Sequence, residues 1–363
     1  MNNSILSIYS FLIKYSFLGE VNSMIDKKVV LITDKNEKIN HADISNRNLE
    51  GNNAISTKTI SEAIMSISKE FELITDVSKF LNSIYDYKDD IIFPMKYGHN
   101  SPDSKSILPG ICEGGHLKYV GGDDYAHIIC NDKYTAKLFA REFGIKTAPS
   151  ILFRKPVDFN SINEALHVLT PPFVIKPNFG GGSTGISTHN VCFDYASATE
   201  LLIKLYTFHK MPILVEEYIP GEEVELILVG NNQKILFSEE VQLIMDKKDF
   251  FDSEIWGFET KKIDDSNIDF RMSSLISQKD ITKIHNLFKA FDKIEFMRVD
   301  GRMYNGEFHL IELSPDCYLG DDCAFYYAFN SKGYSLSQMF EFLITNSLSH
   351  YQLQIPNTLK NLL

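Results

Sequence analysis

Three charged side chains near the end of the sequence are of types suited to metal–phosphate chemistry. Arg298, Asp300 and Glu312 lie on two apolar segments, 296–303 and 307–313, that read as paired strands. Magnesium prefers oxygen ligands and keeps substrate phosphates in its coordination shell. An arginine can stabilise charge that develops on a transferred phosphoryl group. These residues therefore fit a magnesium–triphosphate site, although they could also form an ion-paired surface hairpin.

The metal interpretation depends on the register of this hairpin. Asp300 and Glu312 share a face only if the paired positions sum to an even number. A two-residue turn at 305–306 gives an odd sum and separates the two carboxylates. A three-residue loop at 304–306, ending in a left-handed Gly306, gives an even sum and brings them together. We predict the three-residue loop.

A glycine-rich segment follows a predicted strand in the middle of the chain. The strand, 171–177, contains Lys176, and residues 178–185 then supply glycines and two hydroxyls. Glycine lets a backbone approach a ligand closely, and amides and hydroxyls can donate to phosphate oxygens. The lysine precedes the glycines, so this is not a P-loop. The candidates for phosphate binding are Gly181, Gly182, Ser183 and Thr184; a flexible surface hairpin is the alternative.

An acidic strand, 213–218, comes next, and a Pro-Gly turn separates it from a strand at 224–229. Alternation puts Glu216 and Tyr218 on one face and Glu217 on the other. Such a strand can present backbone groups to an adenine edge and a carboxylate to a ribose. A solvated acidic edge strand is the alternative.

The first 125 or so residues alternate between strand and helix patterns. Strands are predicted at 28–33, 73–74 and 91–93, and a helix at 59–71. This order favours a doubly wound, Rossmann-like domain, but the glycine fingerprint of dinucleotide binding is absent. A further helix is predicted at 132–143, with Lys133 and Lys137 on one face.

Composition excludes several classes of protein. The chain has 363 residues, 44% of them hydrophobic, which predicts two or three subdomains. The net charge of −12 disfavours general nucleic-acid binding. No apolar run reaches the ~18 residues of a membrane span. Five scattered cysteines without a C-x-x-C pair favour reduced thiols in the cytoplasm.

Taken in order, these elements resemble the ATP-grasp superfamily and, within it, the D-alanine–D-alanine ligase group. The resemblance covers roughly residues 90–345, through the stretches 131–137, 144–149, 174–185, 216–223, 298–300 and 312–315. It implies an α/β (α+β ATP-grasp) fold with the nucleotide between two subdomains. The implied limits are a Rossmann-like N-terminal domain at 1–130, a central subdomain at 131–220 and a C-terminal subdomain at 221–363.

The resemblance also implies roles for individual residues. Lys133 and Lys176 would hold ATP phosphates under a lid formed by the glycine loop. The segment from Glu216 to Ile219 would border the adenine, and Glu223 would meet the ribose. Mg²⁺ or Mn²⁺ would bind the two hairpin carboxylates, and Arg298 would stabilise the reacting phosphoryl group. A small carboxylate would form an acylphosphate that a small amine then attacks; a homodimer is compatible with this interpretation.

The departures from the family pattern concern the substrates. Ser314 replaces a metal-binding asparagine and is a weaker ligand, which Asp316 could supplement. Asp316, Asp321 and Asp322 stand where the family grips an acceptor carboxylate, so they favour a cationic or amine-bearing acceptor. Trp256 falls where a lysine of the substrate-covering loop is expected. The alternatives are a true D-alanine–D-alanine ligase and a nucleotide-binding protein that has lost catalysis.

Overall fold

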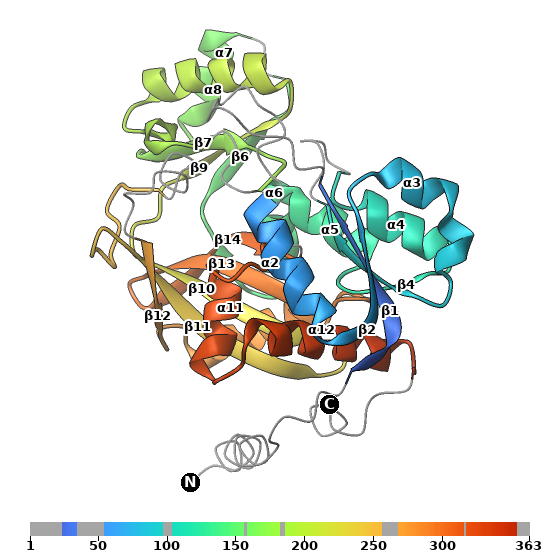
Figure 1. Cartoon of the computed structure of the whole chain (residues 1–363). Helices are drawn as coiled ribbons and strands as arrows, with labels where there is room; N and C mark the ends of the chain where they lie inside the picture. Colours follow the sequence, from blue (N-terminus) through green and yellow to red (C-terminus); the bar gives the residue numbers. More distant parts are fainter. Residues whose placement is uncertain are drawn as a thin grey trace.

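The computed structural model describes residues 24–34, 54–96, 104–155, 158–181, 186–255, 268–315 and 317–353. Within these residues the strands form three sheets (Figure 1). The large sheet lies in the middle, the N-terminal sheet lies beside it, and the central-chain sheet lies at one end.

The N-terminal sheet is parallel, with strand order β2-β1-β3-β4. Its strands are β1 (Ile25–Thr33), β2 (Ser68–Ile74), β3 (Ile91–Met95) and β4 (Lys118–Tyr119). The helices between them are α2 (Ala54–Met65), α3 (Val77–Asn82), the short η1 (Ile84–Tyr87) and α4 (Ile107–Gly114). This confirms the doubly wound prediction.

The predicted helix at 59–71 is wrong in its second half. The helix ends at Met65, and Phe71 lies in β2, where it pairs with Val29 of β1. The apolar spacing continues past the helix end, but pairing with the buried strand β1 decides the conformation of this segment, because tertiary contacts override local periodicity.

The central-chain sheet is antiparallel and has the order β6-β9-β7-β8. Its strands are β6 (Ser150–Phe153), β7 (Phe173–Pro177), β8 (Val191–Cys192) and β9 (Ile213–Glu217). Helices α7 (Phe159–Leu166) and α8 (Tyr195–His209) cover one face and share one core with it. Aspartates 158 and 194 cap these helices through the amides of Ser161 and Ser197, which fixes where each helix begins.

The large sheet has the order β12-β11-β10-β13-β14-β5. Its strands are β5 (Lys146–Thr147), β10 (Glu222–Gly230), β11 (Ile235–Met245), β12 (Ile268–Met272), β13 (Phe296–Tyr304) and β14 (Glu307–Ser314). One face packs against α5 (Asp124–Asn131), α6 (Lys133–Glu142) and α10 (Gln278–Phe288). The other face packs against α11 (Ala324–Ser331) and α12 (Leu336–His350).

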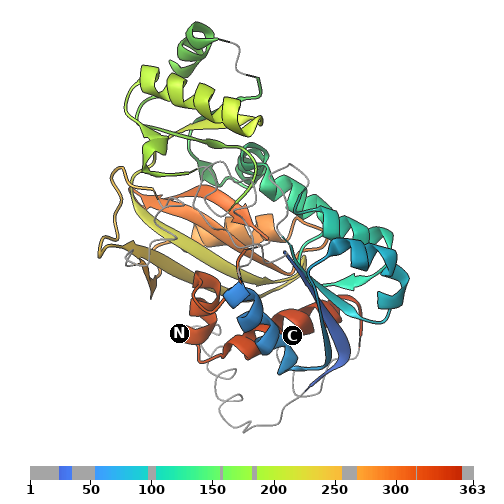
Figure 2. The ribbon, with the colours of Figure 1, turned by 45° about the horizontal axis from the view of Figure 1, so that its top comes forward.

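The C-terminal helix α12 joins the large sheet to the N-terminal sheet, and it lies beside α2 in both views (Figures 1 and 2). Ser347 Oγ donates to Tyr119 O at 2.9 Å, and Asn346 Nδ2 donates to Gly230 O at 2.6 Å. Lys293 Nζ donates hydrogen bonds to Gly121 O at 2.7 Å and to Glu295 Oε1 at 3.0 Å.

The domain limits given above stay a prediction. Within the described ranges, no helix has the length and apolar character that crossing a bilayer requires.

Candidate functional site

The β13–β14 hairpin closes with a two-residue turn, so the predicted three-residue loop is wrong. Tyr304 pairs with Glu307, and the two residues between them have φ of +52° and +76°. Asparagine followed by glycine tolerates two successive positive φ angles, which is what this tight turn requires.

A β-bulge nevertheless brings the two carboxylates together. The register shifts between Asp300 and Gly301, where Ile311 is the extra residue of β14, and Asp300 then pairs with Glu312. Gly301 makes this possible, because a Cβ there would lie 2.2 Å from Phe308 Cε2. The shared face on which the metal interpretation depends is therefore present, but a bulge in the strands produces it instead of the loop.

Arg298 holds Asp300 through two parallel hydrogen bonds. Nε donates to Oδ1 and Nη2 donates to Oδ2, both at 2.7 Å. Glu225 of the neighbouring strand β10 lies opposite Asp300 and approaches Arg298 Nε to 3.5 Å. Burial raises the pKa of Asp300 against the opposing effect of Arg298. Burial also opposes ionisation of Glu312, but Lys133, Lys105 and Arg298 lower its pKa.

Helix α6 and strand β7 each add a lysine to the site. Lys133 begins helix α6, which Asp132 caps, and its Nζ lies 3.5 Å from Glu312 Oε1 and donates to Gly180 O at the start of the glycine loop. Lys176 of β7 forms an ion pair with Glu216 of β9. The two predicted phosphate lysines and the two predicted metal carboxylates thus belong to one connected cluster.

Lys137 links the two halves of this cluster, and sequence reasoning did not include it in the site. Its Nζ lies 3.1 Å from Glu216 Oε2 and donates to the carbonyl of Leu310 at 3.0 Å and to that of Ile311, the bulge residue, at 3.3 Å. Burial lowers the pKa of Lys137 to about 8 even though Glu216 opposes this shift. Burial also opposes ionisation of Glu216, yet Lys137 and Lys176 lower its pKa to about 2. The i, i+4 spacing from Lys133 was the available signal.

Arg302 organises the predicted adenine and ribose side. Its Nη2 donates to Glu223 Oε2 at 2.9 Å, and its Nη1 donates to Tyr218 Oη at 2.5 Å and to Ile219 O at 3.0 Å. A further bond from Nη2 to Glu254 O, at 3.0 Å, reaches the loop that follows β11. Arg302 was also missed, although it continues the alternation of Arg298 and Asp300 along β13, whose pairing with β10 is regular.

The remaining predicted residues are placed less centrally or lie outside the described ranges. Glu217 is on the other face of β9, and its Oε1 accepts from Thr170 N at 2.8 Å. Asp321 and Asp322 are exposed in the turn before α11, and Ser314 pairs with Arg298 at the end of β14. Gly181 closes a described range, whereas the positions outside these ranges are Gly182, Ser183, Thr184, Trp256 and Asp316.

The acids present suit a metal that phosphates help to bind. Over the described ranges, no group of three or more His, Cys, Asp or Glu side chains could enclose a metal ion. Magnesium is commonly bound by one or two carboxylates together with substrate phosphates. The buried pair Asp300 and Glu312, next to Lys133, fits that arrangement.

Comparison with known proteins identifies the family. Residues 139–345 match the model of the family described as D-ala D-ala ligase C-terminus. The chain belongs to this family. This match confirms the resemblance to the D-alanine–D-alanine ligase group that the sequence motifs indicated.

The named proteins whose sequences are similar to this chain include D-alanine–D-alanine ligases. D-alanine–D-alanine ligase A of Escherichia coli K12 is 31% identical over 178 residues, which is 48% of this chain and 45% of the relative. D-alanine–D-alanine ligase of Coprothermobacter proteolyticus is 32% identical over 152 residues, or 42% and 48% of the two chains. The chain thus matches about half the length of these relatives.

Solved structures agree with the fold. The crystal structure of D-alanine–D-alanine ligase from Bacillus anthracis complexed with ATP gives a TM-score of 0.65 at 18% identity, covering 90% of this chain and 99% of that one. The VanG D-Ala:D-Ser ligase from Enterococcus faecalis also gives 0.65, at 19% identity, covering 89% and 100%. The mixed α/β ATP-grasp fold predicted for this D-alanine–D-alanine ligase family member is confirmed.

Proposed function

We propose that this protein is an ATP-dependent carboxylate–amine ligase that joins a small acid to an amine and releases ADP and phosphate. The observation that carries the proposal is the pairing of Asp300 with Glu312 beside Arg298, with Lys133 3.5 Å from Glu312. Membership of the ligase family supports it. The small-molecule substrates and a cytoplasmic location are part of the proposal, and the five free cysteines are consistent with that location.

ATP would lie between the central-chain sheet and the large sheet. Lys133, Lys176 and the loop from Gly181 to Thr184 would hold its phosphates. The backbone of Glu216 to Ile219 would border the adenine, and Glu223, oriented by Arg302, would face the ribose. Mg²⁺ or Mn²⁺ held by Asp300 and Glu312, with Ser314 nearby, would neutralise phosphate charge.

The reaction then needs positioning more than it needs acid–base groups. An oxygen of the acid attacks the γ-phosphorus of ATP, the bond from that phosphorus to the β,γ-bridging oxygen breaks, and ADP leaves. The amine nitrogen attacks the acyl carbon, the carbon–oxygen bond to phosphate breaks, and the nitrogen loses a proton to give the amide. Arg298, which its two hydrogen bonds to Asp300 hold in place, neutralises the charge that develops in both steps.

A D-alanine–D-alanine ligase proper is the second candidate, and the names of the relatives favour it. Robust ADP formation with D-alanine as the sole acid and amine would establish it. The third candidate, a nucleotide-binding protein without catalysis, would bind ATP in calorimetry but turn over no acid and amine pair.

The test is incubation of the protein with ATP, Mg²⁺ and panels of acids and amines, followed by product mass spectrometry. We expect ADP, phosphate and an amide; AMP with pyrophosphate would contradict the acylphosphate route. Asp300→Asn should remove turnover, because it removes one of the two metal carboxylates. The circular dichroism spectrum should stay unchanged. Asp26→Asn, at an 80% exposed side chain, is the matched control and should keep full turnover.

A further inference from the structure

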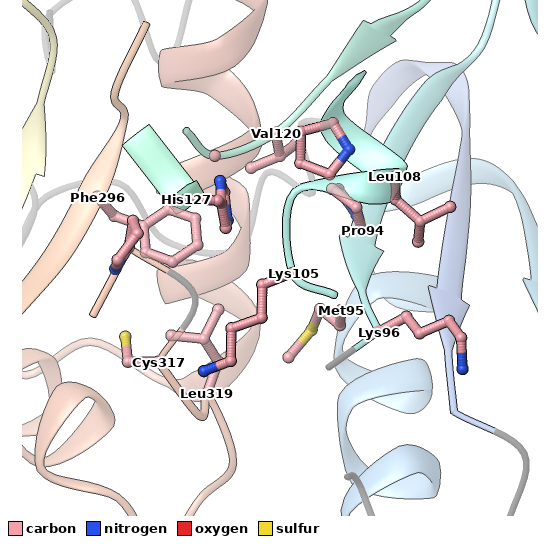
Figure 3. A pocket seen from close by; sticks show the side chains of 13 residues that line it. Pro94, Met95, Lys96, Lys105, Leu108, Val120, His127, Phe296, Cys317 and Leu319 are labelled. Carbon is pink, nitrogen blue, oxygen red and sulfur yellow. The ribbon is translucent and has the colours of Figure 1, made fainter. Parts of the chain in front are cut away.

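The face of strand β13 that carries the candidate reaction centre leaves different room for a ligand at its two ends. Alternation puts Phe296, Asp300 and Arg302 on this face. At one end, Phe296 and Leu319 line a cavity of only about 20 Å³ (Figure 3). A cavity of that size holds a water molecule. A nucleoside attached to phosphates at Asp300 therefore finds no room in this cavity, and the Arg302 end of the strand is the alternative.

Arg302 uses its whole hydrogen-bonding capacity at that end. Its Nε and Nη2 donate to Glu223 Oε2 at 3.2 and 2.9 Å. Its Nη1 donates to Tyr218 Oη at 2.5 Å and to Ile219 O at 3.0 Å, and Nη2 also donates to Glu254 O at 3.0 Å. A guanidinium has five N–H donors in a fixed fork, so all of them are engaged. Arg302, which is 4% exposed, thus joins β10, the crossing at 218–221 and the chain after β11.

Glu223 keeps one carboxylate oxygen for a ligand. Both bonds from Arg302 end on Oε2, and Oε1 accepts no hydrogen bond from the part of the chain that the structure describes. Glu223 pairs with Arg302 across β10 and β13, so it is a diagonal neighbour of Asp300, ~7–8 Å away. In ATP little more than one phosphate group separates the ribose hydroxyls from the terminal phosphates. One nucleotide can therefore reach both carboxylates.

Residues 248–254, which follow β11, are the third partner of Arg302. Gly221 and Phe251 exchange two backbone hydrogen bonds, both of 3.0 Å, which fasten this segment to the crossing. The Phe251 side chain is 1% exposed, and its ring centroid lies 5.1 Å from Arg302 Cζ. The Glu254 carbonyl accepts from the same guanidinium. The 248–254 segment and the predicted ribose carboxylate are thus held by one side chain.

We propose that Arg302 is a positioning residue for nucleotide recognition, which directs Glu223 Oε1 toward the ribose hydroxyls and couples that contact to the order of the 248–254 segment. The proposal rests on the ATP site of the function proposed above. A carboxylate that is already held in place loses less conformational entropy when it binds a ligand. Because coupling is reciprocal, a ribose hydroxyl bonded to Glu223 should also stabilise the segment.

The first experiment measures the dissociation constants of Mg-ATP and of Mg-2′-deoxy-ATP by calorimetry. The deoxynucleotide lacks one hydrogen bond to a charged carboxylate, so the unmodified protein should bind ATP about tenfold more tightly. Arg302→Lys keeps the charge but cannot reach three segments at once, so this ratio should fall below about threefold. An unchanged ratio in Arg302→Lys would overturn the proposal, and so would the absence of a preference in the unmodified protein.

Two further variants separate the ribose contact from a general weakening of the segment. Arg271 of β12, with a 52% exposed side chain, also holds the segment, but its hydrogen bonds go to Gln242 and Asp249. Arg271→Met is therefore the matched control and should leave the ratio unchanged. Glu223→Gln should lower the ratio as Arg302→Lys does, and the double variant should lower it no further, because both changes act on one contact. A further, additive loss would contradict a role of Arg302 through Glu223.

Hydrogen exchange tests the coupling to the segment. At saturating concentrations, Mg-ATP should slow the exchange of the Phe251, Asp252 and Ser253 amides more than Mg-2′-deoxy-ATP does. These amides donate to Gly221 O and to the Glu254 carboxylate, within the segment and its attachment. Arg302→Lys should remove the difference between the two nucleotides. Equal protection by both nucleotides in the unmodified protein would refute the coupling.

Kinetic measurements separate failure of this inference from failure of the proposed function. Arg302→Lys should raise KM for ATP about tenfold and leave kcat and KM for the acid unchanged, because it weakens nucleotide binding alone. The expected binding ratios, with no turnover of any acid and amine, would refute the ligase and keep the positioning role of Arg302. Turnover with an unchanged KM for ATP in Arg302→Lys would refute the positioning role alone.

Discussion

At the scale of single residues, Glu216 is held by two lysines from different elements. It is 5% exposed and lies between Lys176 of its own sheet and Lys137 of helix α6. Its lowered pKa means that the ionised carboxylate stabilises the native state above pH 4.5, its ordinary value, and that this stabilisation is lost as the pH falls toward about 2. Glu216 therefore helps to hold the two sheets together at neutral pH.

Glu216→Gln should destabilise the protein strongly. The substitution leaves Lys137, which is 1% exposed, without its counter-charge, and breaking a buried pair in this way costs about 3–5 kcal/mol. Urea denaturation at pH 7 measures the loss. Glu217→Gln, one residue along on the other face, should cost about 1 kcal/mol or less. Similar losses for both variants would argue against the special position of Glu216.

The limits of residue-level prediction follow from burial. Lys176 and Glu216 were proposed for the site from their types and their neighbours along the chain, and Lys133 from the family resemblance. Lys137 and Arg302 were missed because both are buried charges whose partners lie on other elements, at Glu216 and at Glu223. Such partners become visible only once the sheets are packed together.

At the scale of elements, the β13–β14 hairpin shows a correct conclusion reached through a wrong local reason. Residue types identified the two strands, but they did not distinguish a three-residue loop from a tight turn followed by a bulge. Both solutions put Asp300 and Glu312 on one face, because each shifts the register by one residue. In the structure, the bulge is accompanied by the close approach of Phe308 to Gly301, a contact across the strands that no local pattern carries.

Gly301→Ala should disturb this hairpin and its site together. The added Cβ would lie 2.2 Å from Phe308 Cε2 and 2.8 Å from the His309 carbonyl oxygen, and such overpacking typically costs about 1–3 kcal/mol. Urea denaturation and ADP formation should both report the loss. Gly114→Ala, where nothing lies within 4 Å, is the control and should keep stability and turnover. A Gly301→Ala protein with full stability and turnover would contradict the importance of the bulge.

At the scale of the whole molecule, one core crosses between the first and the last parts of the chain. It includes Val29 and Leu31 of β1, Ile227 of β10, and Phe340 and Ile344 of α12. The core under the central-chain sheet is separate from it. The doubly wound order of the first strands was predictable from the alternation of patterns, whereas this closure by the C-terminal helix involves contacts too distant in sequence for any local pattern.

We expect β1, β3 and α12 to open as one unit in native-state hydrogen exchange, because they share that core. The amides of Leu31, Phe93 and Ile344 should give similar opening free energies. The amides of β7 and β9 should form a second group with a different opening free energy. Bound Mg-ATP should make the opening free energies of the two groups more similar. An N-terminal sheet that opens at a much lower free energy than α12 would contradict this expectation.

The position of the short strand β5 has a mechanical consequence. β5 follows helix α6 and pairs with β14, so Lys133 is tethered to the strand of Glu312. The chain then crosses to the central-chain sheet at Ala148–Pro149 and returns at residues 218–221. A rotation about these two crossings would move Lys176 together with the central-chain sheet, whereas Lys133 would keep its position on the large sheet. A triphosphate that contacts both lysines would therefore bridge the two crossings and favour the conformation in which the central-chain sheet is closed over the large sheet.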